Sequence, residues 1–192
     1  MLNQPTRITA LALLALAGCS ASPEAVDLVQ LRGENTKLRR QIAAFEAERA
    51  TTALNLSLFD ELDLSAFNGR DMERLAEIHA DDVVVYNPDG KTTRGMDPHH
   101  AAELRFLFDK FDLQIPVHLV QFGHADWTAG ISICEGTWRE PITLPDGTVL
   151  EPTGREVRIK VATIARWEDG RIAEEYLFWD NADWNRQVGL ER

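Results

Sequence analysis

The C-terminal half of the chain alternates apolar and polar side chains with a period of two. Successive side chains of a β-strand point to opposite faces of a sheet, so this alternation predicts strands. The dipeptide Asp169-Gly170 separates the last two of them and is typical of a two-residue hairpin turn. The predicted strands cover residues 115–123, 127–139, 156–167 and 171–182.

Before residue 115 the apolar positions take the three-and-four spacing of amphipathic helices. A first helix is expected to end near Gly69, where glycine suits a left-handed cap, and a second begins after Asp71 and ends near His79. A third is expected to open at Asp97-Pro98, with Asp97 as its cap. The β-branched run 83–87 predicts one strand between them. Helices followed by an antiparallel sheet predict the α+β class.

Residues 26–52 carry a heptad repeat in front of this domain. One series of seam positions holds Leu28, Asn35, Ile42 and Arg49, and the other holds Leu31, Leu38, Phe45 and Thr52. Two parallel chains in this register would pair Asp27 with Arg32 and Glu34 with Arg39, which favours a parallel coiled-coil dimer. A single amphipathic linker helix is the alternative, because the repeat is short and Gly33 weakens a helix by about 1 kcal/mol.

The pattern of residues 1–19 predicts a targeting segment. Arg7 precedes the short apolar run 8–16, and the tetrapeptide that ends in Cys19 follows at once. That tetrapeptide, LAGC, resembles the lipobox of bacterial lipoproteins. The resemblance implies a signal peptide at 1–18, cleavage before Cys19 and lipid on that cysteine. Residues 19–25 would form a spacer and 53–192 the folded domain. Ser20 points to the outer membrane.

Composition narrows the choice of partners. The formal net charge is −11, which repels the phosphates of nucleic acid. We therefore expect no nucleic-acid partner.

The chain has two cysteines, Cys19 and Cys134. If Cys19 carries lipid, Cys134 is the one thiol left, so no intrachain disulfide is expected.

Several motifs arrive in an order that resembles the SnoaL-like polyketide cyclase family, which has the nuclear transport factor two-like cone fold. They are RDMERLAEIHADDVVVYNPDGKTTRGMD, HADWTAG, LPDGTVLEPTGREV, ARWEDGRIAEEYLFWDN and RQVGL. The resemblance implies a curved antiparallel sheet wrapped around a pocket that the N-terminal helices close. This scaffold hosts both enzymes and binders.

The last predicted strand supplies the main catalytic candidate. By alternation Tyr176, Phe178 and Asp180 share one face, and Leu177 and Trp179 share the other. Both faces are apolar, which favours a dimer through the sheet. The family's cyclases use a pocket aspartate on this strand as general acid and base, and the resemblance assigns that role to Asp180. The alternative is that Asp180 caps the end of the strand or hydrogen-bonds a backbone amide beside Asn181.

Other candidate residues surround the same pocket. His79 is a candidate proton partner, although it could instead interact with a helix C-terminus. Candidate ligand-binding residues are Tyr86, His99, His118, Tyr176 and Phe178. No H-E-x-x-H occurs, and adjacent His99 and His100 do not share a helix face, so neither a metal nor another cofactor is expected.

These features predict a lipid-anchored periplasmic enzyme of the cyclase or isomerase type that moves a proton with a pocket carboxylate. Its ligand would be small and hydrophobic or carbonyl-containing, and the protein would form a homodimer. Two alternatives stay open: a non-catalytic binder of a hydrophobic ligand, and an envelope interaction protein. A pocket without reachable ionisable groups would favour the binder, and a filled interior would favour the interaction protein.

Overall fold

The computed structural model describes residues 23–190. The predicted signal peptide 1–18, the lipidation site Cys19 and most of the spacer 19–25 lie outside the described residues. The chain divides into two units between Ala43 and Ala44, within helix α1 (Pro23–Glu61). None of the helices in the described part combines the length and the apolar character needed to cross a membrane.

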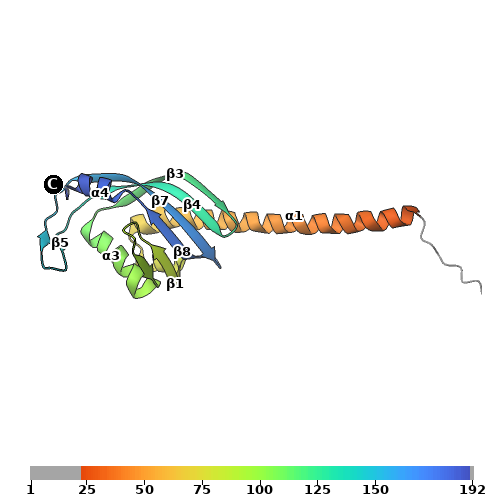
Figure 1. The fold of residues 1–192 in the computed structure, drawn as a ribbon, viewed down its shortest axis with the longest axis horizontal. Coiled ribbons are helices and arrows are strands. Elements are labelled where there is room, and N and C mark those ends of the chain that lie inside the picture. Colours follow the sequence, from red (N-terminus) through yellow and green to blue (C-terminus); the bar gives the residue numbers. More distant parts are fainter. Residues whose placement is uncertain (1–22, 191–192) are drawn as a thin grey trace, which may run out of the picture. The chain divides into compact units, whose positions relative to one another are not determined.

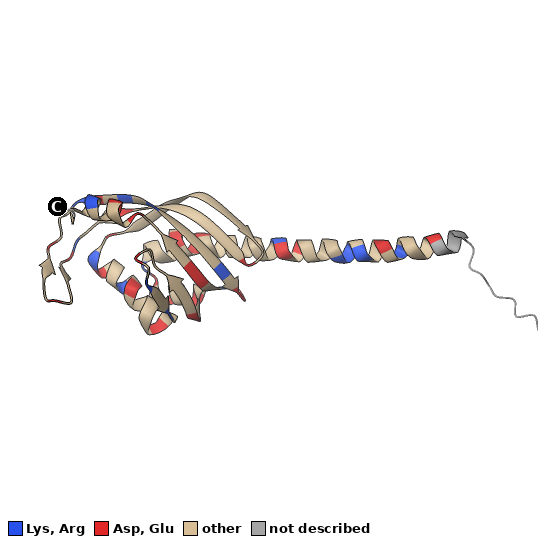
Figure 2. Cartoon of the chain, in the orientation of Figure 1, with Lys and Arg blue, Asp and Glu red and all other residues tan. Residues whose placement is uncertain are grey.

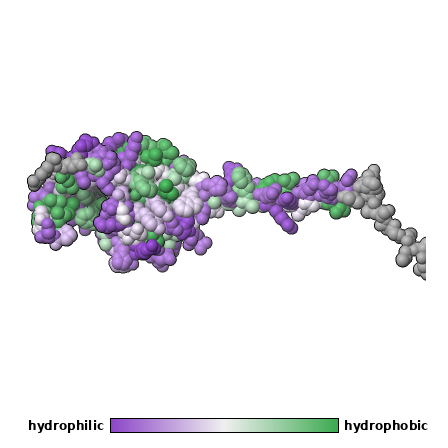
Figure 3. Space-filling view, viewed as in Figure 1, coloured by the Kyte–Doolittle hydropathy of each residue, from purple (hydrophilic) through white to green (hydrophobic). Residues whose placement is uncertain are grey.

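The first unit contains the heptad positions of α1. Four apolar seam residues are exposed by between 55% and 59% of their surface: Leu28, Leu31, Leu38 and Ile42. Within the helix, Arg39 Nε donates to Asn35 Oδ1 at 2.7 Å. Acidic and basic residues are interspersed along this helix (Figure 2), and apolar surface lies between them (Figure 3). The seam has no partner in a single chain, and the coiled coil stays a prediction.

The second unit begins with the C-terminal part of α1, which packs on the sheet. Phe59 and Asn55 are fully buried there, and Asn55 Nδ2 donates to Ala125 O at 3.4 Å. The helix continues as a π-helical turn, η1 (Leu62–Phe67), and ends at Gly69 as expected. However, Arg70 rather than Gly69 takes the positive φ of 54°. Its guanidinium donates to Phe108 O at 3.1 Å, which holds Arg70 in place.

Two further helices follow. Helix α2 (Met72–Ile78) starts as predicted, because Asp71 Oδ1 accepts from Arg74 N at 3.0 Å. The third begins as a π-helical turn, η2 (Met96–His100), and continues as α3 (Ala101–Lys110). Asp97 has the extended backbone of an N-cap residue, with φ −109° and ψ 133°, but within the described residues its side chain makes no capping hydrogen bond.

The main sheet has six strands in the order β2-β1-β8-β7-β4-β3 (Figure 1). Their bounds are β1 His79–Tyr86, β2 Thr92–Arg94, β3 Gln114–His124, β4 Trp127–Thr137, β7 Glu156–Glu168 and β8 Arg171–Phe178. A small hairpin pairs β5 (Ile142–Thr143) with β6 (Val149–Leu150). All main pairings are antiparallel except that of β1 with β8, which is parallel. The α+β class and four of the predicted strands are confirmed.

The end of the chain differs from the prediction. Strand β8 stops at Phe178 instead of residue 182, and helix α4 (Asn181–Val188) follows. The turn before β8 is as predicted, since Asp169 and Gly170 both have positive φ, 49° and 76°. In Figure 1 the curved sheet lies over the C-terminal part of α1, α3 and the loops between them.

The core lies between the helices and the inner face of the sheet. Buried members from the helices are Phe59, Leu62, Phe67, Leu75 and Ile78, and those from the sheet include Val83, Val85, Ile159, Trp167 and Ile172. Several apolar side chains of the strands stay exposed, among them Phe122, Phe178 and Val120. A dimer through this sheet stays a prediction.

Candidate active site

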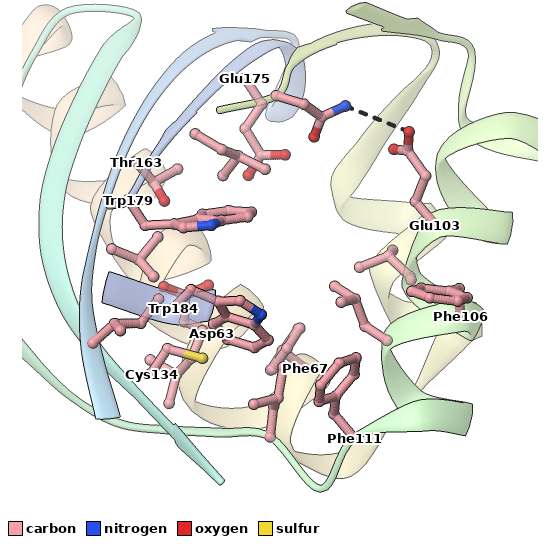
Figure 4. A pocket seen from close by; sticks show the side chains of 18 of the residues that line it. Asp63, Phe67, Glu103, Phe106, Phe111, Cys134, Thr163, Glu175, Trp179 and Trp184 are labelled. Atoms are coloured by element: carbon pink, nitrogen blue, oxygen red, sulfur yellow. Dashed lines mark hydrogen bonds between the residues drawn. The ribbon is translucent and has the colours of Figure 1, made fainter. Parts of the chain in front are cut away.

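A cavity of about 400 Å³ opens between the helices and the inner face of the sheet. Most of its lining is apolar: the aromatic members are Phe67, Phe106, Phe111, Trp179 and Trp184. In Figure 4 the two tryptophans lie on the sheet side and Phe106 lies across from them on α3. A cavity of this size and character suits a small hydrophobic ligand.

One polar group in the cavity wall is Asp63, on the π-helical turn η1, and it is only 8% exposed. His118 of β3 lies between two carboxylates, with Nε2 at 2.9 Å from Asp63 Oδ2 and Nδ1 at 2.8 Å from Asp60 Oδ1. Ser132 Oγ donates to the same Asp63 oxygen at 3.3 Å. We call these four residues the Asp63 cluster. Within residues 23–190, Asp63 Oδ1 receives no hydrogen bond.

The surroundings shift two pKa values in this cluster. Burial raises the pKa of Asp63, and its bonds to His118 and Ser132 only partly offset this. The hydrogen bond to Asp63 raises the pKa of His118 above its ordinary value. Cys134 also lines the cavity, but burial raises its pKa to about 12, so its thiol stays neutral. Asp63 is therefore the group with proton-transfer potential on this side.

A second polar cluster lies in the same cavity wall and contains His79, His100, Glu103 and Glu175. We call it the His79 cluster. The carboxylate oxygen Oε2 of Glu175 is 3.8 Å from His79 Nε2 and 3.9 Å from His100 Nε2. His79, His100 and Glu175 are all buried.

Hydrogen bonds on the far side of each ring fix the two histidines. His79 Nδ1 lies 2.7 Å from Leu75 O, and His100 Nδ1 lies 3.2 Å from Glu103 Oε2. Glu103 also accepts from Thr93 Oγ1 and from Asn87 Nδ2, the second bond being the dashed line in Figure 4. Both rings therefore turn their Nε2 atoms toward Glu175.

Charge coupling favours the ionised forms of His79 and Glu175. Burial acts to lower the pKa of His79, but the nearby Glu175 carboxylate outweighs it and the pKa lies above its ordinary value. Burial acts to raise the pKa of Glu175, but His79 outweighs it and the pKa lies below its ordinary value. A negative charge is thus held in the cavity wall beside two imidazoles.

The prediction of which β8 face lines the cavity was wrong. Glu175, Leu177 and Trp179 line it, whereas Tyr176 and Phe178 lie on the opposite face. Phe178 is 52% exposed. Asp180 follows the strand and is exposed, and its Oδ1 accepts from Ala182 N at 2.9 Å and Asp183 N at 3.0 Å. Asp180 therefore caps α4, close to the alternative considered from sequence.

The remaining candidates divide between the cavity and other places. His79 lines the cavity, and His118 supports it through Asp63. Tyr86 stacks on Tyr176 with ring centroids 4.4 Å apart, and neither ring is among the residues that line the cavity. His99 is exposed and borders a shallower depression near Thr92 and Arg94.

Sequence reasoning missed Asp63, His100, Glu103 and Glu175 as site residues. The one available signal was a carboxylate inside an apolar run, which describes both Asp63 in LFDELDLSAF and Glu175 in AEEYLFW. That signal does not say which carboxylate faces inward. The pairing of β1 with β8 puts His79 on the strand beside the one that carries Glu175, and the apolar pattern does not predict this pairing.

Comparison with known proteins supports this fold. Similar solved structures include a candidate polyketide cyclase from Xanthomonas campestris (18% identity, 72% of this chain and 98% of that chain, TM-score 0.63). IdmH, a candidate polyketide cyclase from Streptomyces antibioticus, is 25% identical over 70% of this chain and 98% of its own, with a TM-score of 0.58. An NTF2-like protein of unknown function from Burkholderia pseudomallei is 20% identical over 70% and 97%, with a TM-score of 0.58.

No curated protein gives a significant match. One family, SnoaL-like polyketide cyclase, matches residues 60–188, which hold both polar clusters and every residue that lines the cavity except Leu190. This match covers well over half of the chain, and the cone fold expected from the sequence motifs is the one observed. The chain belongs to the SnoaL-like polyketide cyclase family.

Proposed function

We propose that this protein is a small-molecule enzyme of the cyclase or isomerase type, in which Asp63 moves a proton of a carbonyl-containing ligand. The observation that carries the proposal is a buried carboxylate in the wall of an apolar cavity, with one oxygen held by His118 and Ser132. The other oxygen, Oδ1, is left for a ligand. The predicted role of pocket carboxylate thus moves from Asp180 to Asp63.

Burial suits Asp63 to this chemistry because it raises the pKa of the carboxyl toward the pH at which an enzyme works. The carboxylate takes a proton from a carbon next to a carbonyl, which leaves an enolate. In a cyclase the enolate carbon bonds to a second carbonyl, and the resulting alkoxide takes the proton back. In an isomerase the proton returns to a different carbon. His118 touches Asp63 rather than the ligand, so it is a positioning residue.

The mostly apolar lining also favours the second candidate, a binder of a hydrophobic ligand without turnover. The two candidates share the cavity and differ only in whether a bound ligand exchanges protons. For either, we propose that lipid on Cys19 attaches the protein to the bacterial envelope, at the periplasmic side of the outer membrane.

The test uses ligands identified by mass spectrometry of small molecules that co-purify with the protein. Each carbonyl-containing ligand is incubated in D₂O, and deuterium uptake at its acidic carbon is followed. We expect acceleration by the wild-type protein and a loss of about 10²- to 10⁴-fold in Asp63→Asn. Asp180→Asn is the matched control, because asparagine caps a helix as well as aspartate and exchange should be unchanged.

Two results would count against the enzyme. Ligand binding without any exchange in the wild-type protein would favour the binder. Equal loss of exchange in Asp63→Asn and Asp180→Asn, with both variants folded by circular dichroism, would remove Asp63 from the role given to it here.

A further inference from the structure

We propose that His79, His100 and Glu175 form a binding site for one divalent transition-metal ion, with Zn²⁺ as the representative case. The site lies in the cavity wall and goes beyond the proton transfer proposed for Asp63. A site with two imidazole nitrogens and one carboxylate oxygen binds first-row transition ions in preference to Mg²⁺ or Ca²⁺.

The three donor atoms are already close together. His79 Nε2, His100 Nε2 and one Glu175 oxygen all lie within 4.8 Å of one another. Ligands at about 2.1 Å from a tetrahedral ion are about 3.4 Å apart. The two distances to Glu175, 3.8 and 3.9 Å, exceed this by about half an ångström, so small movements of the side chains would bring them onto one ion.

The far side of each ring is arranged as metal-binding histidines require. A backbone carbonyl can only accept, so Leu75 O fixes the proton of His79 on Nδ1. Glu103 does the same for His100 through its Oε2. Metal binding requires neutral rings, so it would release the proton that Glu175 stabilises on His79 and leave the lone pairs on the two Nε2 atoms, which face Glu175. Such outer contacts set the orientation and tautomer of histidine ligands in metal sites.

One buried polar atom of the cluster, His79 Nε2, has no hydrogen-bond partner within the described residues. It is the single such side-chain nitrogen or oxygen in residues 23–190, and His79 is only 2% exposed. An unpaired buried polar atom is costly, by about 1 to 3 kcal/mol. A metal ion between this nitrogen and Glu175 would satisfy it.

A catalytic metal centre also needs a coordination position that is open to the ligand, and the cavity would provide it. All three donors belong to its wall, so the positions of the ion not occupied by protein would face the ligand. An ion there would polarise a ligand carbonyl, and Asp63 lies in the same wall. The charges also fit, because Glu175 and Glu103 together offset a divalent ion.

The test measures binding of the metal alone. The full chain, purified without a polyhistidine tag and treated with a chelator, is titrated with Zn²⁺ by calorimetry and with Co²⁺ by visible absorption. We expect one equivalent per chain and Co²⁺ bands typical of a four- or five-coordinate nitrogen and oxygen site. Affinity should fall at least 100-fold in His100→Gln and Glu175→Gln. In the milder Glu103→Gln it should fall by about 10- to 100-fold.

The neighbouring His99 supplies a matched control, because it is exposed and His99→Gln makes the same chemical change. This variant should keep the full affinity. Absence of stoichiometric binding by the folded wild-type protein, or equal affinity in His99→Gln and His100→Gln, would overturn the proposal. If His100→Gln and Glu175→Gln do not fold, an octahedral, water-like Co²⁺ spectrum in the wild type would overturn it. Asp63→Asn should still bind the ion, which separates this outcome from failure of the proposed function.

Discussion

His118 faces a carboxylate with each ring nitrogen, Asp60 on one side and Asp63 on the other. Carboxylates accept, so both nitrogens must donate, and only the imidazolium form can do so. This is the physical reason that the pKa of His118 is raised. The ring also stacks on Phe59, with centroids 5.2 Å apart, which ties the ion pair to the core.

The raised pKa predicts how stability changes with pH. A group whose pKa is higher in the folded than in the unfolded state contributes fully below its unfolded value, here about 6.5, and loses its contribution as the pH rises through the folded value. Asp63, whose pKa is also raised, acts with the same sign. We expect His118→Gln to lower the free energy of unfolding by about 1 to 2 kcal/mol near pH 6. The difference from wild type should shrink toward pH 9.

Urea unfolding of both proteins across this range measures the effect. His99→Gln serves as the reference, since an exposed histidine should leave the curve parallel to that of the wild type. A His118→Gln curve that also runs parallel to wild type at every pH would show that the imidazolium form is not what stabilises the pair.

At the scale of elements, the strands were the most predictable part. Alternation located β3, β4 and β7, and it is clearest in β7, where Val157 and Ile159 are buried and Arg158 and Lys160 are exposed. It could not orient β8, where Glu175, Leu177 and Trp179 on one face compete with Tyr176 and Phe178 on the other. When both faces of a strand are apolar, alternation gives the two sets and packing alone decides which is inside.

Helix α4 was missed for a related reason. Asp180 followed by Ala182 and Asp183, with Gly189 in the left-handed region at the other end, is a complete set of helix start and stop signals. The aromatic run 176–179 just before these signals instead favours a strand that continues to residue 182, which is the prediction made above. The site prediction was wrong for the same reason: Asp180 lies outside the cavity, whereas its neighbour in sequence, Trp179, lines it.

The seam of α1 carries a prediction at this scale. If two copies pair in parallel, Arg39 meets Glu34 of the other chain, so Arg39→Glu creates a like-charge contact and should weaken self-association by a few tenths of a kcal/mol. Arg40 lies one position further, away from the seam, and Arg40→Glu makes the same change in net charge. Sedimentation of both variants at low salt measures the difference.

A control removes the N-terminal part of the helix, up to Ala43. A chain that starts at Ala44 should associate more weakly than the full chain. Equal effects of Arg39→Glu and Arg40→Glu, or identical sedimentation of the full chain and the shortened chain as monomers, would leave the helix as a single linker.

At the scale of the whole molecule, the proposed anchor makes a separate prediction. Cys19→Ser should abolish labelling with radioactive palmitate, leave an uncleaved precursor and release the protein from the membrane fraction. Cys134→Ser is the matched control, because that cysteine is buried and should not carry lipid. Unchanged labelling of Cys19→Ser would mean that the tetrapeptide LAGC is not a lipidation signal.

The parallel pairing of β1 with β8 joins Tyr86 to Tyr176 and closes the middle of the sheet. During synthesis, a chain that has been made only as far as Gly170 already contains both histidines of the His79 cluster but does not yet contain Glu175. Its β1 has β2 as its one neighbour and an open edge on the other side. The carboxylate that completes the donor set arrives with the strand that seals this edge. At the proposed metal site, an unfinished chain therefore lacks one of the three ligands, and only the completed fold can offer all three.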